Sequence, residues 1–143
     1  MPYTFLEDLT IADVAFEATG KTLEELFASA GEAVTATMVK DLTTVRQDVQ
    51  KKISLHSSSA EMLLFDFLQE LVYLKDAELL LFSRFDVRID DTNGDYTLTA
   101  TLFGDMLDQK RQEHLVDVKA VTMHRFELAK TRDGWTCRVI LDI

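Results

Sequence analysis

The period of the hydrophobic pattern changes along this chain, and each period predicts a different kind of element. Residues 12–19 alternate between apolar and polar side chains, which predicts a half-buried strand. The same two-residue period, with turns at Asn93-Gly94 and Asp133-Gly134, predicts several further strands. These further strands are expected at residues 45–56, 85–89, 96–102, 116–129 and 135–143.

Two segments follow the 3.6-residue spacing of a helix that packs one face against a core. The first begins at a capping box, in which Thr22 covers an exposed N–H and Glu25 reaches back, and it ends near Met38. The second follows Ser58, which has a glutamate three residues later, and it runs over the mostly apolar residues 62–74. We expect this second helix to be the central buried one.

The order of these elements predicts the fold class. Two helices come early and several strands come late, without the βα alternation of a parallel sheet. We therefore expect an α+β fold in which two helices pack on one face of a largely antiparallel sheet, as a two-layer sandwich. A length of 143 residues, of which 47% are hydrophobic, suits a single domain over residues 1–143.

Charge and composition narrow the range of functions. The chain has 25 acidic and 15 basic residues, a net charge of −10, so we expect no direct binding of nucleic acid and instead a divalent cation or a basic protein partner. No apolar run is long enough to span a membrane and no leader pattern is present, so a cytoplasmic protein is expected. The lone Cys137 lies on the inward side of its strand, where a buried, inert thiol is expected.

Two aspartates are the main candidates for chemistry. Asp13 and Asp142 both alternate with apolar residues, so both should project from the sheet face that lacks the helices. A main-chain carboxylate at Ile143 would add a third hard oxygen, and such ligands suit calcium or magnesium. The alternative is that each aspartate is an ordinary solvated residue.

Other titratable residues carry less information. The histidines, including His114 and His124, lack the i, i+4 spacing of a zinc site, and we expect them to be structural. Glu7 and Asp8, together with Asp105 and Asp108, are either part of the aspartate region or scattered surface charge. A metal-dependent hydrolase is a further alternative, but no general base is placed beside the aspartates by any spacing.

Several short segments, in order along nearly the whole chain, carry a resemblance to a known family. The chain resembles archease, the small protein that activates the GTP-dependent RNA ligase of tRNA splicing and RNA repair. The matching segments are Phe5-Leu6-Glu7, Ala12-Asp13-Val14, Gly20-Lys21-Thr22-Leu23-Glu24-Glu25, and residues 63–74, 82–85, 118–124, 134–135 and 141–143.

The resemblance implies a metal site, usually described as calcium, formed by Asp13, Asp142 and the main-chain or terminal oxygens of Ile143. The usual family pattern has Glu-His-Thr before Ala-Asp, whereas this chain has no histidine there, and Asp8 is the candidate substitute near the metal. Lys119 and His124, in the matching segment 118–124, and His114 shortly before it are the candidates for a partner surface.

The resemblance also implies a function. Such a protein does not join RNA itself; it promotes guanylylation of the ligase by GTP and allows multiple turnover. The alternative is a general chaperone-like modulator of RNA-modifying enzymes.

Overall fold

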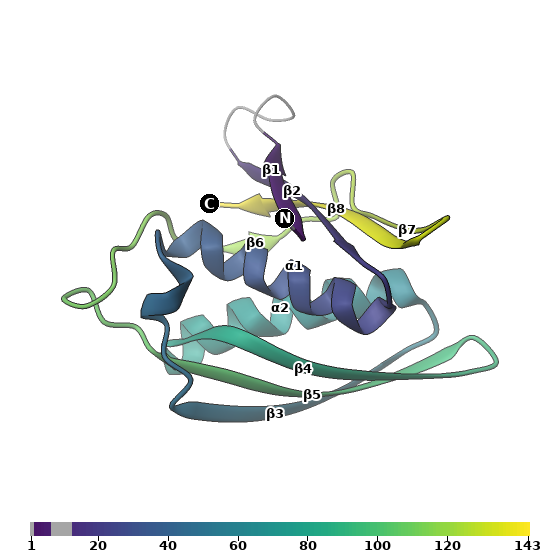
Figure 1. The fold of residues 1–143 in the computed structure, drawn as a ribbon, viewed down its shortest axis with the longest axis horizontal. Helices are drawn as coiled ribbons and strands as arrows, with labels where there is room; N and C mark the ends of the chain where they lie inside the picture. Colours follow the sequence, from purple (N-terminus) through teal and green to yellow (C-terminus); the bar gives the residue numbers. More distant parts are fainter. Residues whose placement is uncertain (1, 7–12) are drawn as a thin grey trace.

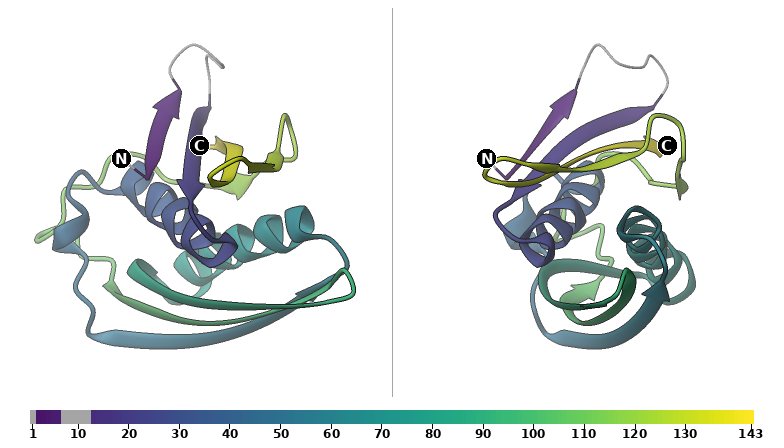
Figure 2. Two further views of the ribbon diagram at one scale, coloured as in Figure 1. Left: turned by 45° about the vertical axis from the view of Figure 1, so that its right-hand side comes forward. Right: turned by 90° about the vertical axis from the view of Figure 1, so that its right-hand side faces the viewer.

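Two helices lie between two antiparallel sheets in the computed structural model, which describes residues 2–6 and 13–143 (Figure 1). The helices are α1 (Leu23–Met38) and α2 (Ala60–Glu78), and a short 3-10 helix, η1 (Leu42–Thr44), follows α1. The views in Figure 2 show the same order of layers from two further directions: sheet, helices, sheet.

The first sheet has the strand order β1-β2-β8-β6, with β7 also paired to β8. Its strands are β1 (Tyr3–Leu6), β2 (Val14–Gly20), β6 (Ala120–Val121), β7 (Glu127–Thr131) and β8 (Gly134–Asp142). The second sheet has the order β3-β5-β4, formed by β3 (Val49–Ser57), β4 (Leu80–Thr92) and β5 (Asp95–Met106). The turn at Asn93 and Gly94 joins β4 to β5, as predicted.

The α+β class with two helices and antiparallel strands is confirmed, but the strands form two sheets where the hydrophobic pattern predicted one. The reason lies in α1, which is buried on more than one side. Large residues such as Leu26 and Phe27 are buried, and so are the small residues Ala30, Gly31 and Ala33. Small side chains let the backbone approach a second layer closely, so α1 packs against both β2 and β4.

Three predicted boundaries differ from the structure. Val45 lies before β3, because its N–H closes η1 by donating to the Leu42 carbonyl. Helix α2 is capped by Ser59, not by Ser58, since the Ser59 hydroxyl accepts from the Met62 N–H at 3.2 Å. The single strand predicted over residues 116–129 is wrong: only β6 and the start of β7 are strands there, and Arg125 between them has a positive φ of 53°.

One hydrophobic cluster unites both sheets and both helices. Its largest fully buried aromatic side chains are Phe16, Phe27, Phe67 and Phe82, one from each of β2, α1, α2 and β4. Among the described residues, no helix is long and apolar enough to cross a membrane. The two helices therefore lie between the two sheets and share one core with both of them.

Gly104 on β5 should be intolerant of any side chain. A Cβ at this position would lie 1.9 Å from the main-chain oxygen of Leu81, and backbone cannot move away as a side chain can. Gly94 has a φ of 81° but open space around it. We expect Gly104→Ala to lower the free energy of unfolding by about 3 kcal/mol or more and Gly94→Ala by about 1 kcal/mol, as measured by urea unfolding. Equal losses would contradict the close approach at Gly104.

Candidate functional site

The pairing of β2 with β8 brings the two candidate aspartates together. The register of this antiparallel pair runs from Gly20 opposite Trp135 to Val14 opposite Leu141. Asp13 directly precedes β2 and Asp142 directly follows Leu141, so one further step of the same register would set the two aspartates opposite each other. Directly opposed residues in an antiparallel pair project to the same face, with Cβ atoms about 4.5–5.5 Å apart. The structure therefore brings the two aspartates to the same end of this sheet.

Burial shows which face of the sheet carries the aspartates. Phe16, Ala18, Val139 and Leu141 belong to the core cluster and face the helices. Asp142, which alternates with them, is exposed, and Asp13 is half-buried. Asp142 thus lies on the face away from the helices, and for Asp13, which precedes β2, the same direction stays a prediction of parity.

The main chain around Asp142 is held on its other side by the segment that leads into β6. The Lys119 N–H donates to the Asp142 carbonyl oxygen at 2.8 Å, and Ala120 pairs with Asp142. Ile143 is half-buried and its side chain packs against the core. These contacts fix the main chain around Asp142, so the main-chain oxygens beside the two aspartates have a defined position.

The remaining acidic candidates do not join this pair within the described part of the chain. Asp105 forms an ion pair with Arg111, and Asp108 lies 3.7 Å from the same guanidinium group. Burial raises the pKa of Asp105, but hydrogen bonds and the Arg111 charge outweigh it and lower the pKa overall. Glu7 and Asp8 lie outside the described residues.

A cluster of three or more histidine, cysteine, aspartate or glutamate side chains with metal-binding geometry is absent from residues 2–6 and 13–143. The donors available there are the two carboxylates and the neighbouring main-chain oxygens. Oxygen-only donors of this kind match calcium or magnesium. Metal ligation by Asp13, Asp142 and Ile143 stays a prediction.

The three residues predicted for a partner surface do not form one cluster. Lys119 directly precedes β6 and His124 follows it, and both are exposed. The Lys119 N–H donates to the Asp142 carbonyl oxygen. His114 bridges to Val39 at the end of α1, and its Nε2 lies 3.0 Å from Gln112 Oε1. Only Lys119 and His124 are therefore positioned beside the strand that carries Asp142.

One buried charge was missed by sequence reasoning. The side chain of Lys75 in α2 is 4% exposed, and its Nζ donates to the Val118 carbonyl at 2.7 Å and pairs with Asp76 at 2.7 Å and with Asp117. Burial lowers the pKa of Lys75, but the hydrogen bonds and charges of Asp117 and Asp76 outweigh it and raise the pKa. Helical spacing in the sequence could have indicated this burial, because Lys75 continues the buried stripe of Leu64, Leu68 and Leu71.

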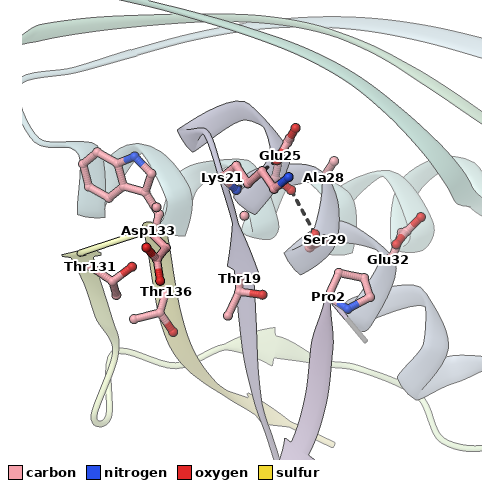
Figure 3. Close-up of a pocket in the computed structure, with 13 residues that line it drawn as sticks. Pro2, Thr19, Lys21, Glu25, Ala28, Ser29, Glu32, Thr131, Asp133 and Thr136 are labelled. Atoms are coloured by element: carbon pink, nitrogen blue, oxygen red, sulfur yellow. Dashed lines mark hydrogen bonds between the residues drawn. The ribbon is translucent and has the colours of Figure 1, made fainter.

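One pocket of the molecule lies away from the aspartates and holds several polar side chains. A pocket of about 620 Å³ sits at the opposite end of β2 and β8, where Thr19, Thr136 and Glu32 line it (Figure 3). Burial raises the pKa of Glu32. The labelled side chains in Figure 3 come from several elements and do not converge on one point, so this pocket presents no recognisable catalytic group.

Cys137 is buried as predicted, on the inner face of β8. Burial raises the pKa of its thiol to about 12. Because the thiolate is the reactive form of cysteine, this side chain has no nucleophilic role near neutral pH.

Together, the fold and the strand register define a class: a small α+β protein with two helices between two antiparallel sheets and two aspartates at one end of the first sheet. Comparison with known proteins identifies the family. The model of the Archease protein family matches residues 3–143, and the chain belongs to this family.

Named relatives and solved structures agree with this assignment. The chain is 38% identical over 133 residues to the protein archease of Methanosarcina barkeri, which covers 92% of this chain and 90% of that protein. It is 36% identical over 132 residues to the protein archease of Methanothermobacter thermautotrophicus, with 92% and 93% covered. The solution structure of a Methanobacterium thermoautotrophicum protein matches with a TM-score of 0.86 at 33% identity over 99% of each chain.

A more distant structure shares the fold alone. The crystal structure of a Thermotoga maritima protein, titled an archease and possible chaperone, matches with a TM-score of 0.59 at 18% identity, covering 94% of this chain and 93% of that one. The architecture of two helices between two sheets therefore extends to remote sequences.

The opposed aspartates should repel each other when no cation is bound. Like charges that face each other across a strand pair are destabilising, so Asp13→Asn in the presence of a chelator should raise the free energy of unfolding by about 0.5 kcal/mol. Glu17 faces Arg138, a residue of opposite charge, in the same strand pair. Glu17→Gln should therefore lower the free energy of unfolding. Urea unfolding at low salt measures both changes, and a loss of stability in Asp13→Asn would contradict direct opposition.

Proposed function

We propose that this protein is a cytoplasmic, metal-binding protein cofactor that activates a GTP-dependent RNA ligase. It promotes guanylylation of the ligase and allows multiple turnover, without joining RNA itself. The observation that carries the proposal is the register of β2 with β8, which ends at Val14 opposite Leu141 and so brings Asp13 and Asp142 to one end of the sheet. These are the positions that the family resemblance assigns to a metal. Membership of the archease family supports the choice of partner that the resemblance implies.

The donor set fits a hard divalent cation. Two carboxylates and the main-chain oxygen of Ile143 are all oxygen ligands, and calcium takes six to eight of them at about 2.3–2.6 Å. Calcium is the first choice and magnesium the second. Asp8 would be a further ligand in place of the usual family histidine. Water or a group of the partner would fill any positions of the calcium shell that these residues leave open.

The surroundings of the aspartates suit a basic enzyme as partner. Asp142 is exposed at the end of its strand, and the net charge of −10 attracts a positively charged surface over long range. Lys119 and His124 flank β6 beside this site and would contact the ligase, with His114 at a more distant position. An activator of this kind needs only to bind the reactive state of the ligase more tightly than the other states.

A chaperone-like modulator is the second candidate, and a specific surface favours it. Leu79, Leu115 and Val116 are 51%, 52% and 40% exposed, and they line a pocket of about 470 Å³ above the buried Lys75. Exposed apolar side chains that gather in one place are typical of surfaces that bind other proteins. The Thermotoga maritima protein of the same fold has been described as a possible chaperone.

Calcium should stabilise the folded protein through the aspartate pair. At a concentration 100 times the dissociation constant, a bound ligand contributes about 2.7 kcal/mol, which corresponds to a rise in Tm of roughly 5–10 °C for a chain of this length. Asp13→Asn and Asp142→Asn should each abolish the rise, whereas Asp90→Asn on the other sheet should retain it. Thermal unfolding with calcium, with magnesium and with chelator makes the comparison. An undiminished rise in Asp13→Asn would refute the site.

The activator role is tested by RNA ligation with the cognate ligase held far below its substrate. Ligase alone should yield about one equivalent of product, because its guanylylation is not renewed. Added wild-type protein should raise the yield many-fold, and Asp13→Asn should not. If the wild-type protein leaves ligation unchanged but suppresses aggregation of unrelated proteins, the chaperone-like candidate replaces the activator.

A further inference from the structure

The buried ammonium of Lys75 connects α2 with the segment that leads into β6. Its Nζ donates to the Val118 carbonyl at 2.7 Å and pairs with the carboxylates of Asp76 and Asp117. A lysine ammonium has three N–H donors, so each donor has an acceptor and the group has one orientation. The side chains of Asp76 and Asp117 are 58% and 65% exposed, which leaves the Val118 carbonyl as the acceptor inside the protein.

Stability alone does not account for a charge at this position. Lys75 continues a helical stripe of buried leucines. An ion pair taken out of water is often no more stabilising than apolar side chains of similar volume. The raised pKa of Lys75 keeps its side chain charged at neutral pH. The charge is therefore better explained by the geometry that it imposes on the groups around it.

The Val118 carbonyl belongs to the same peptide unit as the Lys119 N–H. That N–H donates to the Asp142 carbonyl oxygen at 2.8 Å. A trans peptide unit is planar and directs its C=O and its N–H to opposite sides, so Lys75 and Asp142 hold one rigid group from its two ends. A charged donor on the carbonyl also polarises the unit, which strengthens the hydrogen bond that its N–H donates.

The Asp142 carbonyl, in turn, belongs to the peptide unit that leads to Ile143. Asp142 would contribute its side-chain carboxylate to the proposed metal site, and Ile143 a main-chain oxygen. The hydrogen bond from the Lys119 N–H therefore orients the main chain from which both of these oxygens project. Two peptide units in series connect the buried ammonium with the proposed ligands.

The strand between α2 and β8 depends on the helix for its position. β6 is only two residues long. Gln69 of α2 accepts from the Val121 N–H at 2.9 Å, while Ala120 pairs with Asp142 on the other side. The second half of α2 lies toward the same side of the molecule as the C-terminus (Figure 1). A helix of 19 residues thus supplies the rigid support that such a short strand lacks.

We propose that Lys75 is a positioning residue for the metal site. Its ammonium holds the peptide unit between Val118 and Lys119, and this unit fixes the main chain of Asp142 and Ile143. The inference rests on the metal site of the proposed function. Groups that hydrogen-bond around metal ligands orient them, and loss of such a group typically lowers metal affinity by about 10–100-fold. Lys75 acts on the site only through the main chain and does not touch the cation.

Calorimetric titration of the metal-free protein with calcium compares Lys75→Met with the wild type. Methionine keeps an unbranched apolar stem but donates no hydrogen bond, so the dissociation constant for calcium should rise about tenfold. Charge alone predicts the reverse, because loss of a positive charge strengthens the attraction of an acidic site for a cation. Thr35→Val is the matched control. It removes a buried hydrogen bond from α1 to the Phe82 carbonyl on the second sheet and should leave the affinity unchanged.

A second measurement follows the peptide unit itself and needs no metal. In Lys75→Met, the amide hydrogen of Lys119 should exchange with solvent faster than in the wild type, as measured by NMR. A protein that is merely less stable would show faster exchange at amides throughout its core instead. Unchanged exchange at Lys119 would contradict the proposal.

A further pair of variants tests the same peptide unit while Lys75 is kept. Lys119→Pro and Lys119→Ala remove the same charge, but only proline also removes the N–H that donates to Asp142. Lys119 directly precedes β6, and proline is tolerated at the start of a strand. We expect calcium to bind about tenfold more weakly to Lys119→Pro than to Lys119→Ala. Equal affinities of the two variants would overturn the proposal.

The outcomes separate this inference from the metal site on which it rests. If the wild type binds calcium and Lys75→Met binds it as tightly or more tightly, the inference is wrong and the metal site is retained. If the wild type binds neither calcium nor magnesium, the metal site is wrong, and the inference is wrong with it.

Discussion

The antiparallel pairing of β2 with β8 is the constraint on which the rest of this structure depends. It joins segments about 120 residues apart along the chain and fixes their register over seven residue pairs. Because side chains alternate along a strand, a slip of one residue would turn Phe16 and Val139 away from the helices and bring the aspartates inward. Burial of the apolar set therefore enforces the position of the polar set. The core and the candidate site are two outcomes of one register.

Much of this arrangement could be predicted from sequence because it depends on local periods. The alternation around Phe16 and Leu141 predicted which side of each strand carries an aspartate, and the capping box predicted where α1 begins: the Glu25 N–H donates to the Thr22 hydroxyl at 3.1 Å. The hairpin at Gly94 followed from turn chemistry. In each case the structural signal lies within a few neighbouring residues.

Other features depend on what a residue meets in three dimensions. The division into two sheets follows from burial of α1 on several sides, and a stripe of apolar residues does not reveal the additional buried faces of Ala30 and Gly31. Lys75 looks like an ordinary helix-end lysine until Asp117 and the Val118 carbonyl, more than 40 residues away, are placed around it. Parity alone allowed Asp13 and Asp142 to lie near each other, but the pairing of β2 with β8, which brings both to one end of the sheet, could be seen only in the structure.

The long separation of β2 and β8 also sets the order of events during folding. Contacts between distant segments form late, because the loop-closure entropy must be overcome first. Strand β2 precedes both helices in the chain, whereas its partner β8 follows both helices and the second sheet. A growing chain can bury parts of α1 and α2 against the second sheet while β2 still lacks a neighbour on that side. The two aspartates come to the same end of the sheet only after β8 has paired with β2, so their proximity reports a late step of folding.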